Sequence, residues 1–147
     1  MRACAKMLIL AVLLAGCGSE YPEEPVGGRV RGVLSYQGDA LGDIERPAVG
    51  VYAFTVLELD PQAGVMPSAY RLYEPDFGPR GISYELANLE AGSYDVIAQL
   101  IDLDRPPGEP VALGAYPNLL QAGTAPVEVT MEAPTEDIDI ELYDMGP

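Results

Sequence analysis

Apolar and polar residues alternate with a period of two over most of the chain, and this pattern limits the fold more than any other feature. The segment 127–132 (VEVTME) is an example. Successive side chains of an extended strand point to opposite faces, so such a segment predicts a half-buried strand. Prolines and glycines, 14 and 16 in number, interrupt the alternation between segments. The predicted strands cover residues 28–36, 48–58, 70–73, 82–88, 93–102, 111–116, 127–131 and 138–142.

Strands at spacings near ten residues, without a convincing amphipathic helix, predict an all-β chain. We expect a single antiparallel β-sandwich of about seven strands. The candidate helix at 117–122 is too short to change this class. We expect segments 82–88 and 93–102 to form a hairpin, joined by a turn at 89–92 in which Gly92 supplies a positive φ.

Residues 1–16 have the features of an export signal. Arg2 and Lys6 form a positively charged start, an apolar run covers Met7–Leu14, and small residues precede Cys17. The stretch 7–16 is shorter than the roughly 20 residues that a membrane-spanning helix needs. The sequence therefore predicts cleavage before Cys17.

The quartet 14–17 (LAGC) resembles the lipobox of bacterial lipoprotein precursors. This resemblance implies that the Cys17 thiol carries a diacylglyceryl group and that the new amine is also acylated. Two or three acyl chains hold a protein on a membrane, whereas one chain anchors it only marginally. Cys4 leaves with the signal, so no disulfide is expected. The alternative is an ordinary signal peptide with a chance cysteine at its end.

The rest of the chain divides into a tether and one domain. Residues 17–25 contain two prolines and three glutamates and cannot bury apolar surface, so they predict a flexible tether. Residues 26–147 show no repeat and no second linker, and we expect them to form the β-sandwich domain.

Acidic residues dominate the charge. The full chain has 8 Lys and Arg against 23 Asp and Glu, and losing Arg2 and Lys6 leaves a net charge of 6 − 23 = −17. Such a surface repels nucleic acid and anionic lipid headgroups, and it attracts cations and basic partners. High solubility explains the same charge without any partner.

Three segments resemble the prealbumin-like β-sandwiches, which include carboxypeptidase regulatory-like and Cna-B-type modules. The segments are 28–33 (GRVRGV), 47–53 (PAVGVYA) and 84–98 (YELANLEAGSYDVIA), within a match over roughly 26–143. In those modules, a leucine, two residues, a glycine, one residue and a tyrosine join two central strands, as Leu89 to Tyr94 would here. The resemblance implies a fold and its packing, and it implies no catalytic residue.

One loop has the composition of a cation site. Asp102 and Asp104 lie at positions i and i+2, the prolines and glycine of 106–108 turn the chain, and Glu109 returns a third carboxylate. Oxygen ligands suit a hard cation such as Ca²⁺, although the loop departs from the EF-hand pattern. The alternative is that these carboxylates are simply solvated.

The absence of histidine removes Ser-His and Cys-His catalysis, and no phosphate-binding glycine loop is present. We therefore expect no enzyme and no cofactor apart from the candidate Ca²⁺. The sequence predicts a lipoprotein of the cell envelope that binds an envelope protein or serves a structural role. Gly18 follows Cys17 in place of the Asp that resembles an inner-membrane retention signal in some bacteria, so the lipoprotein resemblance implies the outer membrane. The alternative is a small-ligand or carbohydrate binder that uses exposed tyrosines, with the candidates Tyr52, Tyr70, Tyr73 and Tyr116.

Overall fold

The computed structural model describes residues 27–55, 66–105, 109–120 and 123–146. These residues form an all-β fold with one short 3-10 helix, η1 (Ala40–Asp43). The prediction of an all-β chain is confirmed. The strands are β1 (Gly28–Tyr36), β2 (Pro47–Thr55), β3 (Ala69–Tyr73), β4 (Ile82–Leu89), β5 (Gly92–Asp102), β6 (Ala112–Ala115), β7 (Pro117–Asn118), β8 (Gly123–Thr124), β9 (Val127–Val129) and β10 (Ile140–Asp144).

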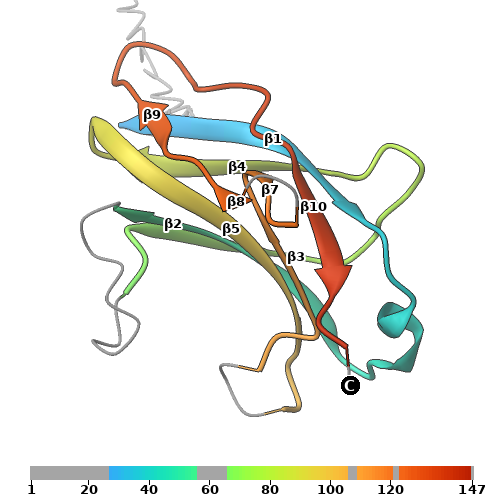
Figure 1. The fold of residues 1–147 in the computed structure, drawn as a ribbon. Helices are drawn as coiled ribbons and strands as arrows, with labels where there is room; N and C mark the ends of the chain where they lie inside the picture. Colours follow the sequence, from blue (N-terminus) through green and yellow to red (C-terminus); the bar gives the residue numbers. More distant parts are fainter. Residues whose placement is uncertain (1–26, 56–65, 106–108, 121–122, 147) are drawn as a thin grey trace, which may run out of the picture.

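Eight of these strands form one continuous, strongly curved sheet (Figure 1). Its order is β3-β2-β5-β6-β10-β1-β4, with β9 pairing beside β5, while β7 and β8 form a separate pair. The continuous order does not confirm the predicted sandwich of two sheets. The expectation of a purely antiparallel arrangement is wrong, because β1 and β10 are parallel, with Leu34 opposite Ile140 and Tyr36 opposite Leu142.

The chain before β10 follows β1 closely. The Arg31 backbone carbonyl accepts a hydrogen bond from the Ile138 amide at 3.0 Å. The Arg31 amide donates to the Thr135 carbonyl at 2.9 Å. Gly32 makes this approach feasible, since a Cβ there would lie 2.0 Å from the Ile138 carbonyl oxygen. The C-terminal strand is thereby brought alongside β1 in the parallel sense.

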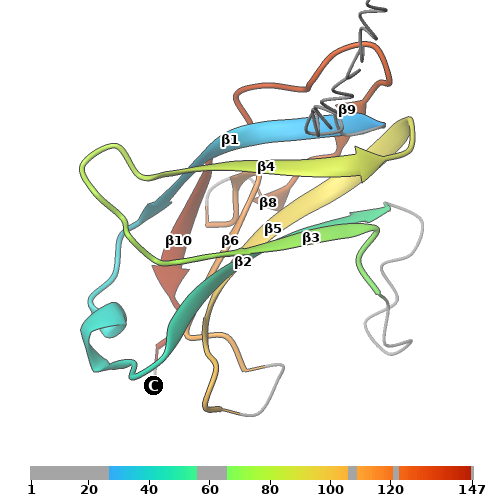
Figure 2. The ribbon, with the colours of Figure 1, turned by 180° about the vertical axis from the view of Figure 1, so that it is seen from behind.

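The predicted hairpin of 82–88 and 93–102 is also wrong. Both segments are strands, but they do not pair with each other. β4 pairs with β1, and β5 pairs with β2 from Tyr94 to Asp102. The short connection instead passes from one side of the curved sheet to the other, as Figure 2 shows. The backbone with positive φ lies at Asn88 (φ 63°), whereas Gly92 is not among the described residues with positive φ.

The inward-facing residues of the strands form one hydrophobic core. Leu89, predicted to be buried beside the turn, is 2% exposed. The Tyr84 hydroxyl crosses the core and donates to the Ile138 carbonyl at 2.6 Å, and burial raises the pKa of this phenol. The largest fully buried side chains are Leu34, Leu86, Leu89, Leu100, Ile140, Leu142, Val30, Val49, Val51 and Val96.

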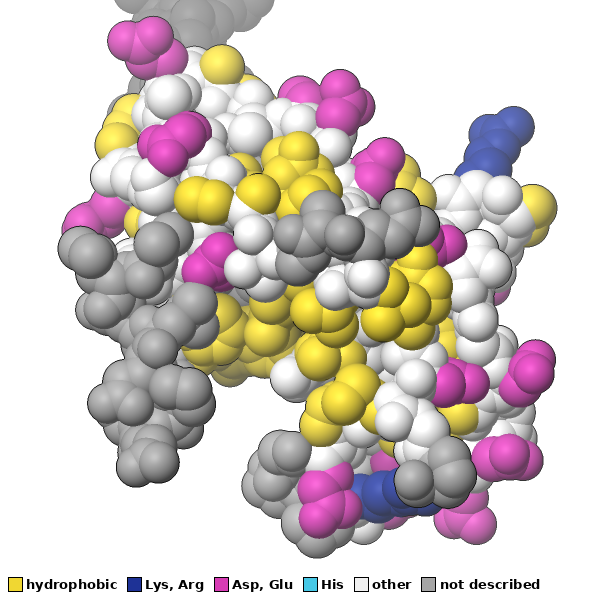
Figure 3. Space-filling model, in the orientation of Figure 1, with side chains coloured by type: hydrophobic (Ala, Val, Ile, Leu, Met, Phe, Trp, Pro, Cys, Tyr) yellow, Lys and Arg dark blue, Asp and Glu magenta, His cyan; other side chains and the backbone are white. Residues whose placement is uncertain are grey.

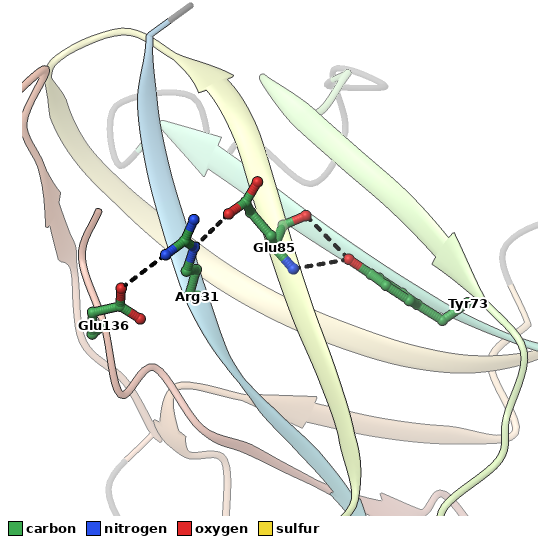
Figure 4. Close-up of polar contacts among 4 residues, drawn as sticks. All are labelled: Arg31, Tyr73, Glu85 and Glu136. Carbon is green, nitrogen blue, oxygen red and sulfur yellow. Dashed lines mark hydrogen bonds and ion pairs between the residues drawn. The ribbon is translucent and has the colours of Figure 1, made fainter. Parts of the chain in front are cut away.

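A tyrosine links the two end strands of the sheet. The Tyr73 hydroxyl on β3 donates to the Glu85 carbonyl on β4 at 3.1 Å and accepts from the Glu85 amide at 2.9 Å (Figure 4). The Glu85 carboxylate on β4 pairs with Arg31 on β1, and Arg31 also contacts Glu136 at 3.2 Å. One phenol thus satisfies two backbone groups at the seam where the curved sheet closes on itself.

Replacing Tyr73 with phenylalanine tests this closure. The change keeps the ring and leaves two half-buried backbone groups of Glu85 without their partner, so we expect a loss of about 1 to 3 kcal/mol in the free energy of unfolding. Urea denaturation measures it. Tyr70→Phe on the same strand is the control, because its side chain is 63% exposed. Equal stabilities for the two variants would show that Tyr73 does not hold the seam.

Candidate functional site

The outer face of β3, β2, β5 and β6 is largely apolar, with Gln99 and Asp95 among its polar residues on β5. On β2, Val49, Val51 and Ala53 point into the core, so the residues between them, and the residues that pair with those on the neighbouring strands, point outward. Figure 3 shows hydrophobic side chains gathered over β5 and its neighbours, with acidic side chains around them. We call this surface the apolar face and define it by the outward residues Tyr52, Phe54, Tyr70, Leu72, Ile97 and Leu113.

Aromatic rings stack on the apolar face. The ring of Tyr52 lies 6.2 Å from that of Tyr70 at an interplanar angle of 19°, and 6.4 Å from that of Phe54 at 25°. Gly50 leaves space for this arrangement, because a Cβ there would lie 2.2 Å from the Tyr52 hydroxyl. Burial raises the pKa of Tyr52, and the neighbouring Tyr70 raises it further, so the phenol is uncharged at neutral pH.

Two residues of the apolar face are exposed, and the other four are partly buried. Tyr70 is 63% exposed and Leu72 is 48% exposed. Exposed apolar residues that adjoin one another in this way mark interaction surfaces more often than scattered ones do. The apolar face is therefore the candidate functional site.

The structure brings together two of the four candidate tyrosines. Tyr52 and Tyr70 are opposite each other in the β2–β3 pairing and form the stack. Tyr73 and Tyr116 instead pack against the core. The register between strands decides this difference, and alternation along one strand does not reveal it.

A carboxylate that the sequence analysis did not single out also lies on the outward side of β5. Asp95 is opposite Phe54 and between the inward residues Tyr94 and Val96, and it is only 5% exposed. The available signal was an acid inside an otherwise apolar run of a predicted strand.

The predicted cation ligands have other partners. Asp104 pairs with Arg46 at 2.8 Å, and Asp102 contacts Arg105 at 3.5 Å while accepting the Asp104 amide at 3.0 Å. Glu109 is exposed. Among the residues with described positions, no group of three acids is placed to hold a metal ion. This geometry lends no support to the calcium site, which stays an untested prediction.

Asp144 is hydrogen-bonded to the segment where η1 begins. Asp144 accepts hydrogen bonds from the Tyr36 hydroxyl and from the amides of Asp39, at 2.9 Å, and Ala40, at 3.3 Å. The Tyr36 hydrogen bond, followed by those two amides, lowers the pKa of Asp144. This carboxylate therefore positions the start of η1 and is occupied by the protein's own donors.

Cys17, the predicted signal peptide and the tether lie outside the described residues. The described part of the chain includes no helix with the length and apolarity to cross a bilayer.

The fold is similar to that of a solved protein. An alternative pilotin from the type II secretion system of Vibrio cholerae aligns with a TM-score of 0.51 and 16% sequence identity, over 81% of this chain and 97% of that chain. At this identity the likeness concerns the fold alone. No protein-family model and no curated protein matches the chain. The resemblance to prealbumin-like modules therefore stays a prediction.

Melting in the presence of divalent cations tests whether Asp102, Asp104 and Glu109 form a calcium site. With Asp102 and Asp104 held by arginines, we expect Ca²⁺ and Mg²⁺ at equal ionic strength to shift Tm equally through screening. Differential scanning fluorimetry measures the shift. A rise specific to Ca²⁺ that disappears in Asp104→Asn would establish the site, because a ligand of the folded state alone stabilises it.

Proposed function

We propose that this chain is a lipoprotein of the cell envelope, anchored through Cys17 in the outer membrane, whose β-domain binds a protein partner through the apolar face. The observation that carries the proposal is the stack of Tyr52, Phe54 and Tyr70 on an otherwise acidic domain. Large, rigid aromatic side chains supply much of the binding energy at protein interfaces. The proposed role is binding, without a catalytic step.

The similar fold of a pilotin supports an envelope role. That protein belongs to a type II secretion system, and the structural alignment covers 97% of its chain. By analogy, we propose that the partner is a protein component of a secretion apparatus. The analogy rests on fold, so the partner must be tested on this chain directly.

A tether as short as the predicted one would keep the domain close to the membrane. Eight residues, 18–25, follow Cys17 before the domain, and an extended chain spans at most roughly 3.6 Å per residue. A domain held on so short a connection meets partners that are themselves close to the bilayer. This favours an integral or membrane-associated envelope protein.

Replacing Cys17 with serine tests the anchor. The variant lacks the thiol that the lipid requires, so we expect the protein to move from the membrane fraction to the soluble fraction. Fractionation of cells after a high-salt wash measures this. Circular dichroism should show the same β structure in both forms, and continued membrane association of the serine variant would refute the anchor.

Serine substitutions on the apolar face test the binding surface. Tyr70→Ser and Leu72→Ser remove exposed apolar area, so each should reduce recovery of the partner at least severalfold. The full lipidated chain is purified with a tag from detergent-solubilised envelopes of its own host, and co-purifying proteins are quantified.

Met131→Ser is the matched control, since Met131 is 56% exposed and lies outside the apolar face. We expect it to recover the partner as the unaltered chain does. Equal recovery by all three variants would place the binding surface elsewhere.

A carbohydrate ligand is the second candidate, because the stacked Tyr52 and Tyr70 rings offer a flat aromatic platform. Neither tyrosine is among the described residues that line the hollows around Asp43, Phe77 and Leu72. Sugar binders usually enclose part of their ligand in a concave site. Titration with envelope-derived oligosaccharides distinguishes the two, since only a sugar site would give saturable binding that Tyr70→Ser abolishes.

A further inference from the structure

Asp95 is an acidic residue at the apolar face, and little of it is exposed. It is the one charged residue among the buried residues of the described chain, at 5% exposure. Its neighbours along β5, Tyr94 and Val96, point into the core, and it lies opposite Phe54 on β2. The carboxylate therefore lies on the same outward side of the sheet as Phe54 and Ile97.

On the side of β5 away from β2, no described strand residue pairs with Asp95. On one side of β5, β9 pairs with Gly92 to Tyr94, and β6 pairs only from Ile97 onward. Asp95 falls between these two partners. The Tyr116 amide bonds to the Val96 carbonyl at 3.0 Å, so the chain after β6 passes beside this gap.

No described residue gives Asp95 a hydrogen bond or an ion pair. The arginines that form ion pairs do so elsewhere: Arg31 with Glu85 and Glu136, Arg46 with Asp104, and Arg105 with Asp102. A fourth, Arg71, lies over the Tyr73 ring at 5.5 Å. The Asp95 oxygens are not among the fully buried side-chain atoms without a partner, which within the described residues are Thr55 Oγ1 alone. The carboxylate therefore meets solvent at the surface, where an incoming cation can pair with it.

We propose, on the basis of the function above, that the apolar face receives a basic amphipathic segment of the partner, with one arginine or lysine paired to Asp95. Apolar side chains flanking that cation would pack on Phe54 and Ile97 and on the stacked tyrosines. The chain has 23 acidic against 8 basic residues, which attracts a basic segment and repels an acidic one. An ion pair enclosed by apolar contacts excludes water and fixes the register of the segment.

Two peptides provide the probe for this pairing. Each has twelve residues of alternating leucine and serine around one central residue, which is arginine in the first and the neutral isostere citrulline in the second. The full lipidated chain is held in phosphatidylcholine nanodiscs, whose neutral headgroups do not attract the peptide. Fluorescence anisotropy of dye-labelled peptides measures Kd.

We expect the arginine peptide to bind the unaltered chain at least tenfold more tightly than the citrulline peptide. Asp95→Asn should abolish this preference and leave citrulline binding unchanged, because the substitution removes the charge and keeps the shape. Glu128→Gln is the matched control, since Glu128 is an exposed acid on the adjacent β9 and its loss changes net charge equally. It should retain most of the preference.

Stability provides a second readout. Since Asp95 has no described partner, Asp95→Asn should keep or raise Tm, whereas an acid with a structural role would lower it on replacement. An absent arginine preference, or an equal loss in Asp95→Asn and Glu128→Gln, overturns the pairing with Asp95. If Tyr70→Ser still weakens both peptides, the binding face stands and only the pairing fails; if Tyr70→Ser changes neither, the proposed face itself fails.

Discussion

The C-terminal strand β10 pairs with β1 on one side and β6 on the other, and the rest of the sheet depends on this insertion. Without it, β1 and β4 would form one ribbon and β3, β2, β5 and β6 another. The parallel pairing with β1 closes a long loop of chain, which costs entropy, and the buried Ile140 and Leu142 offset that cost in the core. Joining the two ribbons curves the sheet until Tyr73 on β3 reaches Glu85 on β4. The inner face is then filled by the core, and the outer face of β3, β2, β5 and β6 remains available.

The alternation of apolar and polar residues predicted where the strands lie, but it did not predict which strands pair with one another. Residues 28–36 and 93–102 match β1 and β5 closely, because alternation and flanking turn residues act within a few positions. Pairing is decided over long distances in the sequence. The turn at 89–92 has the composition of a hairpin, yet β5 gains a longer antiparallel partner in β2 than β4 offers. No local signal distinguishes these two outcomes.

The same limit applies to the candidate site. Each tyrosine was visible in the sequence, but only the register of Tyr52 opposite Tyr70 shows which two converge. Asp95 interrupts the apolar run 94–98 on its outward side, and this interruption was readable without a structure. The sequence does not show that Asp95 is mostly buried and has no ion-pair partner among the described residues, because this depends on the placement of β2, β6 and β9 around it. In the acidic loop around Asp102, composition suggested a cation site, and the structure pairs Asp102 and Asp104 with arginines, while the site itself stays an untested prediction.

The proposed binding role depends on two features of the outer surface, namely the stacked aromatic rings and an acid without a partner among the described residues. Site-specific photocrosslinking in living cells tests this most directly, with a benzophenone amino acid replacing Tyr70 in the full chain. The account predicts a discrete crosslink to one envelope protein from position 70 and none from Met131, and mass spectrometry should find the crosslinked residue beside an arginine or lysine. Crosslinks from position 131 alone, or none from either in the presence of the partner's host envelope, would contradict the account.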